Sequence, residues 1–304
     1  MSSSHMALSL LNMGIRMTTP LLLAALGGAA TEHANIFNIA LEAMMLISAF
    51  TAVVANHLFS SPWMGILAAV ATGLLIGLIF AWFSISLKVD VIVVGSVLNI
   101  LSVGLTTFLL RLLFHVRTTF SSPRMVPIPV IQIAALEKVP LLDALFNGHS
   151  LLTYVAWLLV LVSWFLYYKT PFGLHLRAAG EHPEALATVG ISPDRVKYQA
   201  ALISGAFCGL GGCHLAIGYL NQFVENMTAG RGFIALAAVT FGRGNPARIL
   251  FATVLFGLAD AVAIRLQQVG IPSYFPMMLP YVLTVISLVV VSVREMKRRG
   301  HMKS

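Results

Sequence analysis

Apolar stretches of about twenty residues, separated by short polar breaks, constrain this chain more than any other feature. A helix rises about 1.5 Å per residue, so about 20 apolar residues cross a bilayer. Full-length stretches occupy residues 36–55, 63–87, 91–114, 151–168 and 198–220. Only 10% of all residues are charged, whereas soluble domains carry about 25%. We therefore expect an all-α, polytopic transmembrane helical bundle.

Other apolar stretches are shorter or interrupted. Residues 6–17 are amphipathic and are expected to lie at the membrane interface, ahead of a span at 18–30. Residues 233–241 reach about half the length that a span needs. Full spans are expected again at 246–266 and at 275–293, where Pro280 predicts a kink. The total is about 8–10 spans, with short broken helices among them.

A single domain accounts for the whole pattern. Residues 7–296 form one transmembrane unit, because no stretch is polar enough to make a separate soluble domain. Residues 1–6, MSSSHM, resemble a cloning remnant and carry no functional weight.

Basic residues predict the orientation, because positive charge beside spans marks the cytoplasmic face. Placing the tail at 294–299 and the polar loop at 169–197 inside also places Lys88, Arg243 and Arg248 inside. The outward loops are then 115–150 and 221–230, with about nine crossings and an outside N-terminus. The net charge of +8 is thus explained by topology and not by nucleic acid, although the tail could also bind anionic lipid.

The polar loop at 169–197 contains more than a simple connection requires. RAAGEHPEALATVGI predicts a short helix over 178–189 that ends in a glycine turn at Gly190. Ser192-Pro193-Asp194 predicts the start of the next helix, with a serine cap, a first-turn proline and an acid at the positive end of the dipole. A structured polar hairpin of this kind indicates a docking surface for another protein.

Catalytic motifs are missing from the sequence. It has no nucleophile elbow, no HExxH and no phosphate-binding glycine loop ending in Lys-Ser or Lys-Thr. Cys208 and Cys213 lie five positions apart in one apolar segment, on different helix faces, and are expected to be buried thiols without a metal. The chain is expected not to be an enzyme, so any nucleotide hydrolysis would occur on another subunit.

Glu42 is the exceptional residue of the apolar segments, because a carboxylate at that depth is costly and should face a cavity or a partner. It could line a pathway, hold a broken helix in shape, or pair near the interface with a neighbour such as His33. Asn38 and Asn99 could line the same pathway or join helices by hydrogen bonds.

Larger side chains offer weaker indications. Met45 and Phe241 could stack against a flat apolar ring or simply pack in the core. Asp260 and Arg265 lie five residues apart in one span, where an ion pair or water-facing positions would explain them.

A family resemblance joins these features. TTPLLLAALGGAATEHANIFNIALEAMMLISAF is similar to the N-terminal signature of bacterial ABC importer permeases for nucleosides, a subgroup of the ribose/branched-chain amino acid permease family. GRGFIALAAVTFGRGNPARILFATVLFGLADA resembles the second signature, RAAGEHPEALATVGISPDRVKY the coupling segment and MLPYVLTVISLVVV the final span. The resemblance extends from about Arg16 to Val293. The family usually has glycine where this chain has Ala40 and Ala43, which puts the exact substrate geometry in question.

The resemblance implies a permease subunit similar to those of type II ABC importers, in a bacterial cytoplasmic (inner) membrane. Its partners would be ABC ATPase subunits, a second and non-identical permease, and a periplasmic or lipid-anchored substrate-binding protein. ATP and magnesium would be bound by the ATPase, and this chain would bind no cofactor. The cargo would be a nucleoside; simple sugars or branched-chain amino acids are alternatives, and an ion-coupled secondary transporter is a further one.

Two sets of residues carry these expectations. The substrate pathway is expected to include Asn38, Glu42, Met45, Asn99, Phe233 and Phe241. The coupling segment that meets the ATPase is expected to include Arg177, Ala178, Gly180, Glu181, Pro183, Glu184, Gly190 and Ile191.

Overall fold

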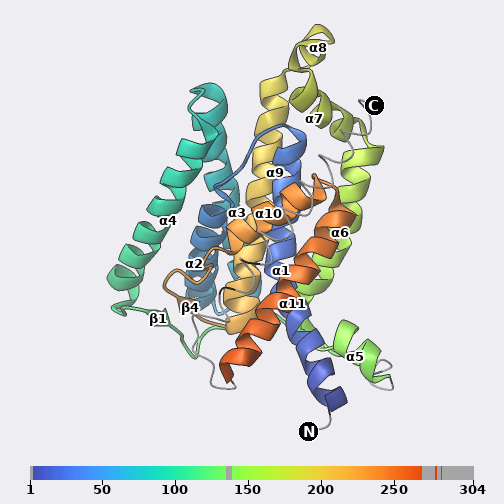
Figure 1. The fold of residues 1–304 in the computed structure, drawn as a ribbon. Coiled ribbons are helices and arrows are strands. Elements are labelled where there is room, and N and C mark those ends of the chain that lie inside the picture. The colour runs from blue at the N-terminus through green and yellow to red at the C-terminus, as the bar shows by residue number, and fades with distance from the viewer. Residues whose placement is uncertain (1–2, 135–138, 269–277, 279–281, 283–304) are drawn as a thin grey trace.

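The computed structural model describes residues 3–134 and 139–268, together with positions 278 and 282. Within them the fold is a bundle of helices, and seven helices are long and apolar enough to cross a membrane (Figure 1). The long helices are α1 (Ser3–His33), α2 (Leu41–Phe59), α3 (Pro62–Ala81), α4 (Val91–Phe114), α6 (Leu151–Lys169), α9 (Pro193–Cys213) and α11 (Pro246–Gln268). The predicted all-α transmembrane bundle is confirmed. The last predicted span, 275–293 with its kink at Pro280, lies outside the described residues except for positions 278 and 282.

Short elements connect the long helices. Two π-helical segments extend α3 and α9, namely η1 (Trp82–Ser86) and η2 (His214–Leu220). The short helices are α5 (Pro140–Phe146), α7 (Pro171–Glu181), α8 (Pro183–Thr188) and α10 (Arg231–Gly242). Strand β1 (Thr119–Phe120) pairs antiparallel with β4 (Phe223–Val224), with Thr119 opposite Val224. Strand β2 (Val130–Ile131) pairs antiparallel with β3 (His149–Ser150), with Val130 opposite Ser150.

Helix α1 corrects one prediction. The amphipathic segment at 6–17 does not lie apart at an interface but forms one continuous helix with the predicted span, and Pro20 is inside that helix. The reason is packing against α11: Gly14 touches Leu258, and a Cβ at Gly257 would overlap Thr18. The side of this segment that the sequence left uncovered therefore packs against α11, a helix that begins at Pro246.

The polar elements gather at the two ends of the bundle. Helices α7 and α8 lie at one end, and α5, β1 and β4 lie at the other, with the N-terminus (Figure 1). The polar loop at 169–197 is thus opposite the loops at 115–150 and 221–230, as the charge pattern requires. Which end faces the cytoplasm stays a prediction from charge.

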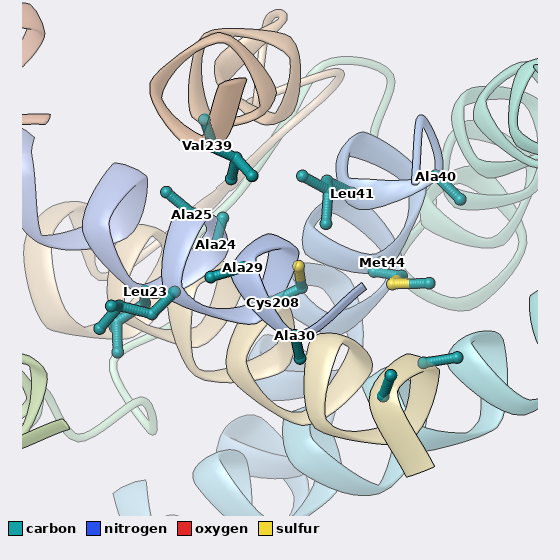
Figure 2. Close-up of a cluster of buried hydrophobic side chains, with 14 of the residues drawn as sticks. Leu23, Ala24, Ala25, Ala29, Ala30, Ala40, Leu41, Met44, Cys208 and Val239 are labelled. Atoms are coloured by element: carbon teal, nitrogen blue, oxygen red, sulfur yellow. The ribbon is translucent and has the colours of Figure 1, made fainter. Parts of the chain in front are cut away.

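Small residues set the distances in the core. In α9, Gly205 approaches the backbone of Gly73 in α3, and Gly212 approaches the backbone of Met45 in α2, so closely that a Cβ would overlap it. Such residues let membrane helices pack at short range. Alanines and leucines of α1 fill the neighbouring space with side chains from α2, α9 and α10 (Figure 2). The half-length helix α10 is therefore part of the packed interior.

Candidate functional site: a broken-helix junction and a polar helix pair

Helix α10 begins inside the bundle, and a carboxylate from a distant helix holds its start. The two carboxylate oxygens of Glu42, in the first turn of α2, accept hydrogen bonds from the backbone N–H groups of Gly230, at 2.8 Å, and Gly232, at 2.6 Å. Glu42 is only 5% exposed. The first N–H groups of a helix lack partners within the helix and carry partial positive charge. Glu42 therefore acts as the N-terminal cap of α10.

Glycines make this contact possible. Gly230 has φ of +84°, which glycine adopts without strain. At Gly232 an added Cβ would overlap the backbone of Glu42 and would lie 2.8 Å from its Oε2. The Gly-Arg-Gly sequence at the start of α10 thus lets two backbones meet around one carboxylate.

The start of α2 is capped in the same manner, by an amide. Asn99 of α4 accepts a hydrogen bond from the N–H of Ala43 at 2.9 Å and donates one to the carbonyl of Ile39 at 3.1 Å. Ala40, the residue before α2, offers no capping side chain of its own. Asn99 therefore supplies, from another helix, one acceptor and one donor to the broken backbone.

Asn38 completes the break before α2. Its Oδ1 accepts from the N–H of Ala40 at 3.0 Å, and its Nδ2 donates to Ser204 Oγ of α9 at 3.0 Å. Asn38 is 1% exposed. Of the two roles open from the sequence, these bonds favour helix-to-helix bonding for Asn38.

Asp260 is a second acidic residue near the start of α10. Arg231 lies 3.8 Å from Asp260 of α11 and also donates to the carbonyls of Met227, at 3.2 Å, and Thr228, at 3.3 Å. Asp260 thus pairs with Arg231, whereas the sequence suggested Arg265. A spacing of five residues turns about 140° around a helix, so Asp260 and Arg265 point in different directions.

The remaining predicted pathway residues are dispersed. Met45 is fully buried in the core, and Phe241 is partly buried against the same cluster. Phe233, which follows Gly232 in α10, is 46% exposed. Asn99 thus lies at the start of α2 and Glu42 at the start of α10. Phe233 is exposed beside the start of α10, whereas Met45 is enclosed in the core.

The polar loop forms a pair of helices, α7 and α8, where one helix was predicted over 178–189. The division falls at His182–Pro183, because His182 leaves the helical conformation, with φ of −141°, and Pro183 lacks the N–H that a continuous helix uses. Gly190 has φ of +80°, and Ser192 Oγ accepts from the N–H of Arg195 at 3.4 Å. The glycine turn and the serine cap are confirmed.

The predicted coupling residues divide into two groups. Glu181, Pro183, Glu184 and Gly190 are exposed, and residues 181–185 line a hollow of about 400 Å³. The others face the bundle: Ala178 and Ile191 pack on the core, and the Arg177 guanidinium lies 5.4 Å from the ring centre of Tyr168.

Gly180 makes the closest of the inward contacts. A Cβ there would lie 3.0 Å from backbone atoms of Ala34 and Asn35 and would overlap the carbonyl of His33. The sequence suggested His33 only as a possible partner of Glu42, but Glu42 bonds to the start of α10 and His33 bonds to Gly244. Ser204 and Gly232 were not singled out from the sequence as functional positions.

Comparison with known proteins decides the family. Residues 10–288 match the family described as "Branched-chain amino acid transport system / permease component". The chain belongs to this permease family. It is 38% identical to the guanosine ABC transporter permease protein NupQ of Bacillus subtilis, covering 88% of this chain and 87% of that protein. It is 34% identical to the nucleoside ABC transporter permease protein NupC of Lactococcus lactis, covering 89% and 88%.

Two further comparisons concern another relative and a solved structure. A permease of Haloferax volcanii, TsgC13, which is provisionally named for glucose, is 34% identical and covers 87% of this chain and 80% of that protein. A solved ABC transporter in an inward-facing conformation shares the fold, with a TM-score of 0.52 and 16% identity over 93% of this chain and 85% of that one. The chain is therefore a multi-pass membrane protein, the permease subunit of an ABC transporter and not its ATPase. Permeases of ABC transporters generally have an ATPase and a binding protein as partners.

Proposed function

We propose that this chain forms half of the pathway by which an ABC importer moves nucleosides across a bacterial cytoplasmic membrane. The observation that carries the proposal is the 38% identity with a guanosine permease over 88% of the chain. A nucleoside is flat, neutral and rich in hydrogen-bonding groups. Its recognition requires aromatic surface and fixed polar groups, without a countercharge.

Phe233 is the residue best placed to touch such a cargo. Its side chain is 46% exposed, and it follows Gly232 directly on the helix whose start Glu42 holds. Stacking of a base on an aromatic ring contributes about 1–3 kcal/mol. Glu42, whose oxygens both accept backbone hydrogen bonds, acts by fixing α10 and thereby Phe233. Asn99 acts less directly, because it fixes the start of α2 and thereby the position of Glu42.

The partners follow from the two ends of the bundle. Helices α7 and α8 meet the ATPase, which binds the ATP and magnesium, and their exposed residues Glu181, Pro183 and Glu184 form the contact surface. The loops 115–150 and 221–230 meet the loaded binding protein at the opposite end. A second, non-identical permease completes the pathway; this is supported by the two separately named guanosine permeases of Bacillus subtilis, NupQ and NupP.

Glucose is the second candidate cargo, because one relative at 34% identity carries a provisional glucose name. Sugars present hydroxyl groups on an apolar ring face and would also suit an exposed aromatic side chain. A branched-chain amino acid would carry a carboxylate and would require a cation or a free helix N-terminus. The N-terminus of α10 is occupied by Glu42, which disfavours that cargo.

Transport by the purified complex tests the proposal. Permeases, ATPase and binding protein are placed in vesicles, and uptake of labelled guanosine, glucose and leucine is measured with ATP, without ATP, and with an ion gradient alone. We expect uptake of guanosine that depends on ATP. ATP-dependent uptake of glucose alone would favour the second candidate, and uptake driven by the ion gradient alone would contradict both.

A further inference from the structure

Helix α10 contacts the α1–α2 connection at both of its ends. At its start, Glu42 accepts the two backbone hydrogen bonds described above. Just beyond its last residue, Gly242, the carbonyl of Gly244 accepts a hydrogen bond from His33 Nε2 at 3.1 Å. His33 ends α1 and Glu42 is the second residue of α2. Each end of α10 is therefore held by one side chain from the residues that flank the connection at 34–40.

His33 also contacts the elements that carry the polar helix pair. Its ring centre lies 5.2 Å from that of Tyr167 and 5.9 Å from that of Tyr168, both near the end of α6. Tyr168 in turn lies beneath the Arg177 guanidinium of α7. His33 is thus in contact with α6 and the α10–α11 turn, and its own carbonyl is part of the close contact with Gly180 of α7.

Two glycines make these contacts rigid. The contact of Gly180 with residues 33–35 is between backbones, so no flexible side chain can absorb a displacement of α7. Gly244 has φ of +70°, and a Cβ there would lie 3.1 Å from both Cε1 and Nε2 of the His33 ring. A shift of α7 against the end of α1 must therefore move the His33 ring and the carbonyl that it holds, or break the hydrogen bond between them.

We propose that His33 is a positioning residue for transport. Its hydrogen bond to Gly244 links movement of α7 to the C-terminal end of α10. The inference rests on the proposed function in one respect, namely that α7 and α8 receive the force of the ATPase. Force enters at α7, passes through the Gly180 contact to the end of α1, and reaches α10 through His33. Glu42 holds the far end of α10, so the helix turns as one body and carries Phe233 with it.

Three single variants separate this role from simple packing. His33→Phe keeps an aromatic ring against Tyr167 and Tyr168 but has no N–H for Gly244. His33→Gln lacks the ring but keeps an N–H donor for Gly244. Thr240→Ala is the control, because Thr240 lies exposed near the same end of α10 and its hydroxyl donates to the carbonyl of Leu236 in its own helix.

The measurement is nucleoside uptake per ATP hydrolysed, in vesicles that hold the whole complex. We expect H33F to lower this ratio about fivefold, the factor that one neutral hydrogen bond is worth, with ATP hydrolysis stimulated as in wild type. H33Q and T240A should stay within about twofold of wild type. A ratio in H33F equal to wild type, or an equal fall in H33Q and H33F, would overturn the assignment.

A fourth variant covers the case in which H33F does not assemble. His33→Met has about the length of glutamine but no N–H for Gly244, so it should lower the same ratio where H33Q does not. An unchanged ratio in H33M would then count against the proposal. Failure of the proposed function is distinguishable, because the wild-type complex itself would then show no ATP-dependent nucleoside uptake.

Discussion

Glu42 and Gly232 are 190 positions apart in the sequence, and a carboxylate oxygen of the first accepts the backbone N–H of the second at 2.6 Å. This contact fixes the start of a helix that is too short to cross a membrane by itself. A carboxylate that looked anomalous in an apolar segment is thereby explained by the backbone it satisfies. The arrangement leads to four predictions beyond the test of His33.

Replacing Glu42 by glutamine should weaken the start of α10. The amide offers one oxygen where two N–H groups need acceptors, and its NH2 group would face an N–H. Leaving one buried donor unsatisfied costs about 1–3 kcal/mol. We expect a lower unfolding temperature of the purified chain and a fall in uptake of about tenfold or more.

The control for this change is Asp90→Asn. Asp90 caps α4 from its own chain position, accepting from Ile92 at 2.8 Å and Val93 at 3.2 Å. Asparagine caps a helix about as well as aspartate, so D90N should behave like wild type. If E42Q matched D90N in both stability and uptake, the capping role of Glu42 would be wrong.

A methyl group at Gly232 should be poorly tolerated. Gly232→Ala would force the start of α10 away from Glu42, and overpacking of this kind costs about 1–3 kcal/mol. The matched change is Gly104→Ala in α4, where an added Cβ meets nothing within 4 Å. Thermal unfolding of the two variants should show a loss for G232A and no loss for G104A. Equal stability of the two would argue against the close backbone contact.

Two substitutions at Asn99 should give a graded effect. Asn99→Asp keeps an acceptor for the N–H of Ala43 but loses the donor to Ile39, whereas Asn99→Leu loses both. Each buried group left without a partner costs about 1–3 kcal/mol, so N99L should lower the unfolding temperature more than N99D. Identical unfolding temperatures for wild type and N99L would show that Asn99 does not cap α2.

Gly180 and Glu181 are neighbours with different environments, so their variants should fail in different ways. Gly180→Val would collide with the end of α1 and should lower uptake per ATP while binding of the ATPase persists. Glu181→Leu changes an exposed residue and should weaken binding of the ATPase. Co-purification of the ATPase and the uptake ratio separate the two defects. A normal uptake ratio in G180V would contradict the transmission of force at this contact.

Much of the fold was predictable because hydropathy reports directly on membrane spans. The predicted stretches at 91–114 and 151–168 correspond to α4 and α6 almost residue for residue. The span predicted at 36–55 begins later, at Leu41, because Asn38 and Asn99 bind the backbone of residues 39–43 and hold the chain in an irregular form. Apolar character alone does not distinguish this lead-in from the helix.

The site was harder to predict, since its contacts join residues that are remote in the sequence. Glu42 stood out because an intramembrane carboxylate requires a partner, but nothing local indicates that the partner is the backbone of α10. His33 was indicated only as a possible partner of Glu42, whereas in the structure its ring donates a hydrogen bond to Gly244. Its role depends on the end of α6, the contact at Gly180 and the turn after α10, which only the folded chain brings together.

Hydrogen exchange at the start of α10 tests the central claim most directly. The claim is that Glu42 holds the N–H groups of Gly230 and Gly232, so the segment spanning 228–234 should exchange slowly in wild type and in D90N. In E42Q the same segment should exchange about five times faster or more, as expected when about 1 kcal/mol or more of local stability is lost. Equal protection in wild type and E42Q would contradict the account.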